Sequence, residues 1–273
     1  MTIAEAIRAA AGRLSATSDT ARLDAEWLMA HALGVSRSDL LLRHMDQPEP
    51  ASFVALVERR IQHEPVAYIL GEAEFFGRSF LVNPDVLIPR GDSESVVAAA
   101  LEAAPDAGRV LDLGTGSGAL LLTLLAELPT LEGVGIDASL GVLAVAAANA
   151  ARLGVADRAH ILRGDWREPD WAAGLGRFDL VIANPPYVET CAVLDPEVRD
   201  FEPASALFAG PDGLDDYRTI VPQLRKLLTE TGVAVLEIGA SQADAVSQLA
   251  GENGFSIELR RDLAGRPRAL VLR

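Results

Sequence analysis

The chain has 273 residues, of which 49% are hydrophobic and 23% are charged. This length and hydrophobicity predict a globular protein with a larger and a smaller domain, and they exclude intrinsic disorder. Acidic residues outnumber basic ones by 39 to 24, so the formal net charge is -15. Because a phosphate backbone is bound by clustered Lys and Arg, this balance disfavours direct binding of nucleic acid and favours a neutral or basic partner.

The sequence also disfavours a metal site and association with a membrane. The single cysteine, Cys191, excludes an intrachain disulfide and is too little for a thiolate metal site. The four histidines, which have no ligand spacing, are His31, His44, His63 and His160. No stretch reaches the ~18 to 20 apolar residues that span a bilayer, and charges near the start interrupt any signal-peptide pattern. We therefore expect a soluble, cytoplasmic protein without a metal site or a membrane partner.

Residues 1–75 carry a helical pattern. Thr2 and Glu5 have the spacing of a capping box at the start of the first helix. A second helix is predicted to end at Gly34 and to carry an apolar stripe made of Leu23, Trp27, Ala30 and Leu33. A later helix has an apolar face formed by Phe53, Leu56, Val57 and Ile61. We predict a small bundle of about four helices.

The segment 66–90 has a different character. Aromatic and β-branched residues cluster there between Gly71, Gly77 and Pro84. This composition predicts a short hairpin that links two domains, and we place the linker at 76–92.

From Gly108 onward, short apolar strands alternate with longer helical stretches. The predicted strands are 110–113, 134–136, 160–162, 179–183 and 233–238, and the predicted helices are 119–128, 140–153, 217–228 and 242–253. This alternation predicts a doubly wound, Rossmann-like α/β fold over residues 93–273, with a mostly parallel sheet covered by helices on both faces. The last two strands, 256–259 and 269–272, lack an intervening helix and should pair antiparallel.

A glycine-rich loop follows the first strand of this sheet and reads Gly114-Thr115-Gly116-Ser117-Gly118. Glycines at a strand-to-helix turn allow positive φ values and let a ligand lie against the main chain at the carboxyl edge of the sheet. The spacing differs from the dinucleotide fingerprint, and no Lys follows as it does in a phosphate loop. The loop therefore predicts a nucleoside-like ligand without a strongly anionic tail.

Two acidic residues and a tryptophan follow the next two strands. Asp137 ends the second strand, about 20 residues beyond the glycine loop, where a carboxylate can accept hydrogen bonds from both ribose hydroxyls. Asp165 and Trp166 follow the third strand, where they suit an adenine amine and the face of its ring. Each has an ordinary alternative, a helix cap for Asp165 and a core aromatic for Trp166. Their ordered occurrence at successive strand ends favours the ligand site.

The fourth strand leads into Asn184-Pro185-Pro186-Tyr187. If this strand lies beside the first, as in the doubly wound order, Asn184 faces the glycine loop. The two prolines fix the backbone and remove two amide donors, which leaves carbonyls such as that of Pro185 free to accept hydrogen bonds. Tyr187 offers a flat face to a planar group. The alternative, a rigid turn with a core tyrosine, is disfavoured because the turn occupies the functional edge of the sheet.

This set of acceptors suits an amide-type nitrogen that attacks an electrophilic methyl group. Such a nitrogen is a poor nucleophile because its lone pair is delocalised, and acceptors aimed at its N–H groups stabilise the positive charge that develops. By analogy with a lost oxyanion donor, one contact of this kind is worth about 2.7–4 kcal/mol of barrier. Alignment of the reacting atoms supplies up to roughly 7–11 kcal/mol. The residues predict a methyltransferase whose cofactor is S-adenosylmethionine.

Several segments spread over nearly the whole chain resemble the release-factor glutamine methyltransferases. They are PVAYILGEAEFFG at 65–77, VLIPRGDSE at 86–94, DLGTGSG at 112–118, IANPPY at 182–187, EVRDFEPASAL at 197–207 and GPDGL at 210–214. Adenine-N6 methyltransferases share the Asn-Pro-Pro-Tyr element, so the specific part of the resemblance lies in the linker segment and the Phe-Glu-Pro segment. The chain departs from the family in having Gly91 where proline is common and Ser93 where threonine is common.

This resemblance implies methyl transfer from S-adenosylmethionine to the glutamine of a Gly-Gly-Gln loop in class 1 peptide-chain release factors. It assigns Gly114–Gly118, Asp137, Trp166 and Asn184 to the cofactor and Asn184–Tyr187 to the glutamine, with the helical domain gripping the release factor. A glutamine of a ribosomal protein is an alternative substrate, and an adenine base is a weaker one because of the acidic charge. A catalytically silent adapter is a further alternative, which the intact Asn184 and prolines disfavour.

Overall fold

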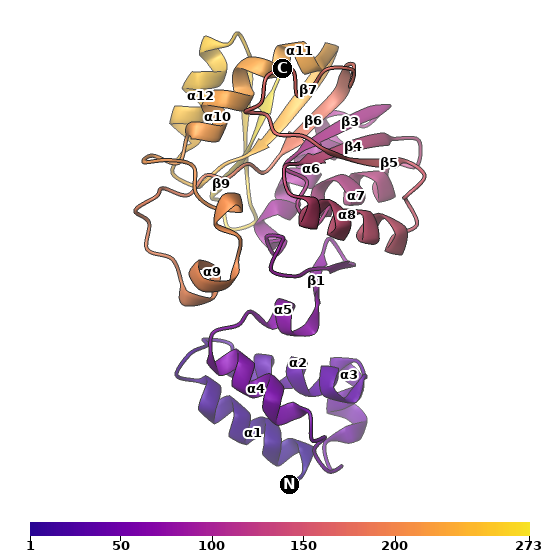
Figure 1. Cartoon of the computed structure of the whole chain (residues 1–273), viewed down its shortest axis with the longest axis vertical. Helices are drawn as coiled ribbons and strands as arrows, with labels where there is room; N and C mark the ends of the chain where they lie inside the picture. Colours follow the sequence, from indigo (N-terminus) through magenta and orange to yellow (C-terminus); the bar gives the residue numbers. More distant parts are fainter. The chain divides into compact units, whose positions relative to one another are not determined.

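The computed structural model describes residues 1–273, which form two compact units (Figure 1). The first unit comprises Met1–Glu72 together with Leu194–Glu202, and the second comprises Ala73–Val193 and Pro203–Arg273. The domain predicted over residues 93–273 includes 194–202, which the structure places in the first unit instead. Composition does not reveal a short segment of one domain that packs with the other. No helix of the chain has both the length and the apolar character needed to cross a membrane.

The first unit is a helical bundle. Its helices are α1 (Ile3–Leu14), α2 (Ala21–Leu33), α3 (Arg37–Asp39), α4 (Phe53–Ile61), α5 (Val66–Leu70) and α9 (Pro196–Phe201), with a π-helical turn at Leu40–His44. The capping box of α1 is confirmed, since Thr2 and Glu5 each accept a hydrogen bond from the other's main-chain N–H. Gly34 ends α2 with a φ of 67°, as predicted, because glycine has no Cβ to clash in this conformation.

The apolar stripe predicted on α2 is wrong in part. Leu23 and Trp27 are 39% and 42% exposed, whereas Asp24 and Glu26 are buried. The polar residues can lie inside because both are paired: Glu26 accepts hydrogen bonds from two arginines, and Asp24 accepts them from an arginine and two hydroxyls. Pairing between segments has overridden the helical periodicity.

Arg60 joins three parts of the first unit through a buried ion network. Its Nε donates to Asp24 at 2.8 Å, and its Nη1 donates to Glu197 of α9 at 2.7 Å. The same Nη1 donates to the main-chain oxygen of Glu64 at 3.3 Å. Burial alone would lower the pKa of Arg60, but its hydrogen bonds to the two carboxylates raise it above its ordinary value. The guanidinium is therefore charged and holds the segment 194–202 to the bundle.

Arg60→Met is expected to lower the free energy of unfolding by about 3–5 kcal/mol, because it leaves Asp24 as a buried carboxylate without its cation. Urea unfolding followed by circular dichroism measures the loss. The matched control is Arg59→Met, one residue earlier on α4, whose pair with Glu64 lies nearer the surface and should contribute at most about 1 kcal/mol. Equal losses in the two variants would contradict a stabilising role for the buried network.

The second unit begins with a hairpin and continues as a seven-stranded sheet. The hairpin strands are β1 (Glu72–Phe75) and β2 (Arg78–Leu81). In spatial order the sheet consists of β5 (Ala159–Arg163), β4 (Glu132–Asp137), β3 (Arg109–Leu113), β6 (Phe178–Ala183), β7 (Leu228–Glu237), β9 (Pro267–Leu272) and β8 (Ile257–Arg261). The doubly wound order predicted from the sequence is confirmed.

The helices of this unit are α6 (Glu94–Ala103), α7 (Ala119–Glu127), α8 (Leu140–Arg152), α10 (Asp215–Ile220), α11 (Leu224–Leu227) and α12 (Ala243–Glu252). Short 3-10 turns occupy Gly91–Ser93, Ala204–Ala206 and Val221–Gln223. The single helix predicted over 217–228 is therefore wrong. Pro222 lacks the N–H that would continue α10, and the chain passes through a 3-10 turn into α11 instead.

Alternate residues of the central strand β6 point into two separate cores. Leu180 and Ile182 pack with α6 and α7, while Val181 and Ala183 pack with α10, α11 and α12. Figure 1 shows α7 and α8 on one side of the sheet and α10 and α12 on the other. Because both faces are covered, the parallel strands consist of nearly continuous apolar residues, which is why the sequence located them well.

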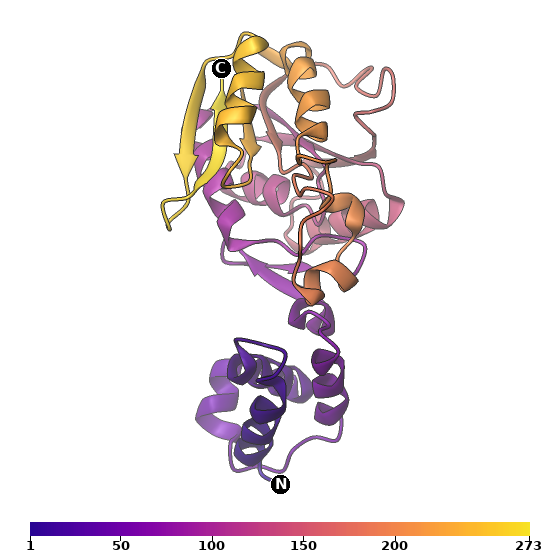
Figure 2. The same ribbon diagram turned by 90° about the vertical axis from the view of Figure 1, so that its left-hand side faces the viewer.

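The two C-terminal strands pair antiparallel, as predicted. β9 lies between β7 and β8 and pairs antiparallel with both, and Figure 2 shows β8 and β9 side by side in yellow. On the other side of the centre, β3 lies directly between β4 and β6 and is parallel to both. The carboxyl ends of β3, β4 and β6 therefore meet at one edge, which brings the glycine loop and the Asn184–Tyr187 motif together.

Candidate active site

A pocket lies at this edge of the sheet, within the second unit. The predicted residues that line it are Gly114, Thr115, Gly116, Ser117, Asp137, Asp165, Trp166, Asn184 and Pro186. Three other predicted residues adjoin the pocket without lining it. Gly118 starts α7, Pro185 is buried inside the motif, and Tyr187 is half-buried beyond it. The structure thus brings residues from four strand ends, which are far apart in sequence, to a single pocket.

The glycine loop is tied to β4 through its first residues. The N–H groups of Gly114 and Thr115 both donate to the main-chain oxygen of Ile136, at 3.0 and 2.9 Å. Gly114 has a φ of +74°, and a Cβ there would lie 3.1 Å from the indole ring of Trp166. The absence of a Cβ, together with the positive φ, therefore lets the indole ring pack against the main chain of the loop.

Asp137 projects from the end of β4 toward the same loop. Its Oδ2 accepts a hydrogen bond from the Gly116 N–H at 3.3 Å, and its Oδ1 accepts one from the Ser139 N–H at 3.1 Å. Burial raises the pKa of Asp137, and the nearby Asp165 carboxylate raises it further, while these N–H groups oppose the shift. Each carboxylate oxygen keeps a free lone pair, so the group can still accept hydrogen bonds from two adjacent hydroxyls.

Trp166 is fixed in place by its own polar atom. The indole N–H donates to Asp216 at 2.8 Å, and the main-chain oxygen of Trp166 accepts a hydrogen bond from Gln223 at 3.2 Å. Asp165 lines the pocket, and it accepts a hydrogen bond from the Arg167 N–H at 3.0 Å within a turn. No helix follows it, so the helix-cap alternative is wrong. The bonded indole closes one side of the pocket as a rigid wall.

The Asn184–Tyr187 motif is held by two loops that follow it in sequence. The side chain of Gln242 donates to the main-chain oxygens of Tyr187 and Gly213, at 3.0 and 3.1 Å. Gly213 has a φ of +70°, and a Cβ there would lie only 2.2 Å from the Tyr187 oxygen. The glycine of the segment 210–214 therefore permits this close approach. Both prolines of the motif are buried, so Asn184 is presented to the pocket from a rigid turn.

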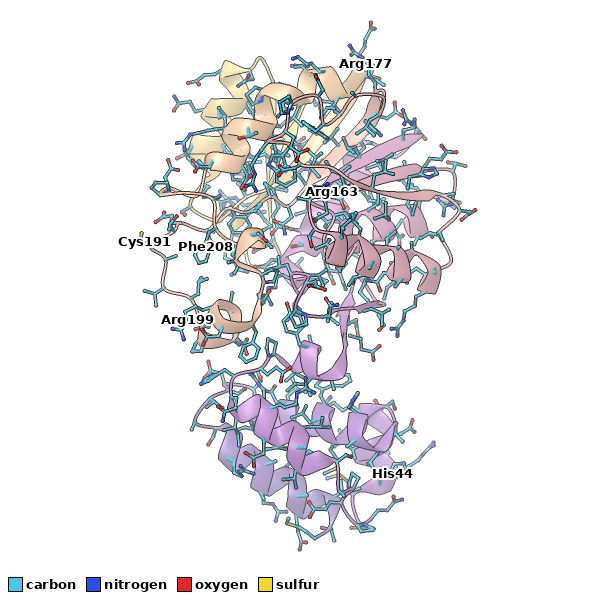
Figure 3. The ribbon with its side chains drawn as sticks, in the orientation of Figure 1. His44, Arg163, Arg177, Cys191, Arg199 and Phe208 are labelled. Carbon is cyan, nitrogen blue, oxygen red and sulfur yellow. The ribbon has the colours of Figure 1, made fainter.

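The chain that leaves the motif returns to it as a short bridge. The Val188 N–H donates to the oxygen of Leu207 at 2.8 Å, and the Ala209 N–H donates to the oxygen of Val188 at 2.9 Å. Cys191 lies on the intervening loop with an exposed thiol, and Figure 3 shows it at the periphery of the molecule. The thiol is thus a loop residue that takes no part in the pocket.

Asp112, inside β3, does not line the pocket but supports the glycine loop through Thr115, a role that the sequence reasoning missed. It is 1% exposed; its Oδ2 accepts a hydrogen bond from the Thr115 hydroxyl at 2.7 Å, and its Oδ1 has no partner. Burial raises the pKa of Asp112 to about 7, and the Asp137 carboxylate adds to the shift. The signal was present, because an acidic residue interrupts an otherwise apolar strand. Asp216, which orients Trp166, was missed because no local pattern links the two.

These groups fit S-adenosylmethionine. The Asp137 carboxylate suits ribose hydroxyls, and the glycine loop suits a flat nucleoside. Apolar side chains complete the lining, among them Phe75, Val86, Leu120 and Val142. No group of His, Cys, Asp and Glu residues is arranged to hold a metal ion.

Comparison with known proteins shows the family of the chain. Residues 5–71 match the family model described as PrmC N-terminal domain, and residues 92–202 match the one described as Methyltransferase small domain. A release factor glutamine methyltransferase of Geobacter sulfurreducens is 44% identical over 243 residues, which cover 87% of this chain and 84% of the relative. Another, from Cereibacter sphaeroides, is 44% identical over 281 residues, which cover 100% and 99%. The chain belongs to the family of release factor glutamine methyltransferases.

As a release factor glutamine methyltransferase by family, the chain has the expected fold. The solved structure of a methyltransferase from Pyrococcus furiosus matches it with a TM-score of 0.51 at 13% identity, covering 72% of this chain and 89% of that one. At this identity the likeness concerns the fold alone. Together with the parallel sheet and the helices on both its faces, it confirms the predicted α/β class I methyltransferase fold.

Proposed function

We propose that this chain transfers a methyl group from S-adenosylmethionine to the side-chain amide nitrogen of the glutamine in the Gly-Gly-Gln loop of class 1 peptide-chain release factors. The observation that carries the proposal is the pocket in which Asn184 and Pro186 face the glycine loop, Asp137 and Trp166. The family of the chain supports the choice of a release factor as substrate. The reaction would modify a factor of translation termination, which places it in the cytoplasm.

In this proposal the cofactor is held by residues of three strand ends. Asp137 accepts hydrogen bonds from the ribose hydroxyls, Trp166 covers the adenine face, and the main chain of Gly114–Gly118 lies against the nucleoside. Asp165 accepts a hydrogen bond from the adenine amine. When bound, the cofactor supplies an electrophilic methyl group on a sulfonium.

In this proposal the Asn184–Tyr187 motif binds the side chain of the substrate glutamine. The carboxamide oxygen of Asn184 and the main-chain oxygen of Pro185 accept hydrogen bonds from the two N–H groups of the substrate amide. Since the prolines offer no N–H, the main chain of the turn is poor in donors, and its acceptors favour the positive charge that develops on the nitrogen. Burial raises the pKa of Tyr187 to about 12, so its phenol stays neutral, as a wall for a planar amide requires.

The helical first unit has a different task in this proposal. It belongs to a separate family model, and its sheet-free bundle contains none of the pocket residues. We assign it to recognition of the release factor. The chain would thus select its substrate with one unit and methylate it with the other.

The test is methylation of candidate substrates side by side by the purified full chain with labelled S-adenosylmethionine. We expect label on an intact release factor, located by peptide mass spectrometry at the glutamine of its Gly-Gly-Gln loop. A release factor with alanine in place of that glutamine is the control and should take up no label. Label on a ribosomal protein or on DNA, with none on the release factor, would overturn the proposal.

A further inference from the structure

A cluster of buried polar atoms without partners lies where β7, β9 and the start of α6 meet. Six buried side-chain N and O atoms in the chain have no hydrogen-bond partner, and three of them are Ser93 Oγ, Glu237 Oε2 and Arg268 Nε. These residues are 4%, 1% and 7% exposed. The strand pairing holds the last two together, since the Ile238 N–H donates to the main-chain oxygen of Arg268 at 2.9 Å. Buried groups left unsatisfied at one place point to a function.

The cluster adjoins the Asn184–Tyr187 motif. Ser93 lines the pocket, so one end of the cluster reaches the site itself. The Tyr187 ring lies beside Gly239, two residues beyond the end of β7, because a Cβ on Gly239 would lie 3.4 Å from its Cδ2. Tyr187 and Glu237 are close enough to affect each other's pKa: the tyrosine lowers the pKa of Glu237, and the charge of Glu237 raises the pKa of the tyrosine. Glu237 therefore lies behind the aromatic wall of the site.

The charged groups around Glu237 come from every element that packs against it. Burial raises the pKa of Glu237 to about 7; Ser93, Arg268 and Tyr187 oppose the shift, and the charge on Asp92 adds to it. Arg268 donates to Asp92 at 2.8 Å and lies 3.8 Å from Asp262. The other titratable or charged groups that face this region are Arg90 and, on α10, Asp216 and Tyr217, whose hydroxyl donates to the main-chain oxygen of Glu237 at 2.7 Å.

We propose that Glu237 is a positioning residue for methyl transfer, whose ionised carboxylate holds Tyr187 in place behind the substrate amide and supplies a negative charge that favours this step. The inference rests on the proposed function. In the reaction the nitrogen lone pair forms the new N–C bond, the S–C bond breaks with its electrons going to sulfur, and the nitrogen releases one proton to water. Positive charge passes to the nitrogen, and a buried carboxylate nearby favours that transfer.

Turnover at saturating substrates, measured from about pH 5.5 to 9, tests the inference. Because Glu237 is charged only above its raised pKa, the wild-type turnover number should rise through about pH 7 and fall about tenfold at pH 6. Glu237→Gln should lower the turnover number about tenfold at pH 8.5, because one charged hydrogen bond is lost. It should also flatten the acid limb, which is the rise of the turnover number between about pH 5.5 and 7. Glu237→Asp, which restores the charge, should recover the acid limb. A Gln variant with the wild-type turnover number and acid limb would overturn the inference.

Two control variants separate this role from a structural one. Thr123→Val changes another buried atom without a partner in the same unit and should keep the wild-type pH profile. Asp112→Asn changes the other buried carboxyl whose pKa is raised, and it should raise the KM for the cofactor while keeping the acid limb of turnover. Loss of that limb in either control would contradict the assignment to Glu237.

A measurement without substrate distinguishes this inference from the proposed function. In urea unfolding, the effects of Tyr187→Phe and Glu237→Gln should be non-additive at pH 8, where Glu237 is charged, and additive at pH 5, where it is neutral. Additive effects at both pH values would overturn the inference even if the release factor is methylated. Non-additivity at pH 8 alone would support the contact with Tyr187 even if a different substrate proves correct.

Discussion

Replacing Asn184 with alanine is expected to lower the turnover number by a factor of about 10²–10³, while the affinity for S-adenosylmethionine changes little. The carboxamide oxygen is the side-chain acceptor that the motif presents to the substrate N–H. Its removal takes away a contact that strengthens as positive charge develops, and a comparable contact is worth about 2.7–4 kcal/mol of barrier. Cofactor affinity is set mainly by groups on other strand ends, Asp137 and the glycine loop. Single-turnover rates and calorimetric titration with cofactor measure the two effects separately.

Two further variants make this prediction sharper. Asn184→Asp keeps an oxygen acceptor at the same position and should retain more activity than the alanine variant. Asn253→Ala removes an asparagine whose amide donates to the main-chain oxygen of Leu249 at 2.9 Å, away from the pocket, and should leave turnover unchanged. An Asn184→Ala enzyme with the wild-type turnover number would remove the carboxamide from the mechanism.

Replacing Asp137 with alanine is expected to weaken the binding of S-adenosylmethionine by roughly a hundredfold or more. The carboxylate is placed to accept two hydrogen bonds from the ribose, and each hydrogen bond to a charged group contributes about 1.5–3 kcal/mol. Asp137 also accepts the N–H groups of Gly116 and Ser139, so its loss additionally frees the glycine loop. Titration calorimetry with S-adenosylmethionine measures the change.

Comparing two substitutions of Asp137 separates the effect of its charge on cofactor binding from the effect of its shape. Asp137→Asn keeps one acceptor oxygen but loses the charge, so its affinity should lie between those of the wild type and the alanine variant. Asp106→Ala, at an exposed position of the same unit, is the control and should bind the cofactor like the wild type. If all variants bind the cofactor equally, the ribose is held elsewhere and the assignment of Asp137 fails.

Local patterns in the sequence were sufficient to predict most strands and site residues of the second unit. β3, β4 and β6 were found because strands buried on both faces are continuous apolar runs, and their order followed from the alternation with helices. The glycine loop, Asp137 and the Asn184–Tyr187 motif could be assigned to one edge because parallel strands have their carboxyl ends together. The capping box of α1 and the glycine that ends α2 were equally readable, since each depends on residues at most a few positions apart.

The remaining features depend on contacts between residues that are distant in sequence. Asp24 can be buried on α2 because Arg60 reaches it from α4, and the segment 194–202 joins the first unit through Glu197. Trp166 is a fixed wall because Asp216 bonds its indole, 50 residues later. No periodicity or spacing encodes such pairs.

The Asn184–Tyr187 motif shows which features the sequence determines and which depend on the tertiary structure. Its residue types alone established a turn rich in acceptors and poor in donors, because proline chemistry does not depend on the rest of the fold. Tertiary structure decided what surrounds that turn: the close approach of Gly213 to the Tyr187 oxygen, and the buried Glu237 behind the tyrosine ring. Burial changes the charge of a carboxylate only once the chain has folded around it, so the electrostatics of the site belong to the tertiary structure.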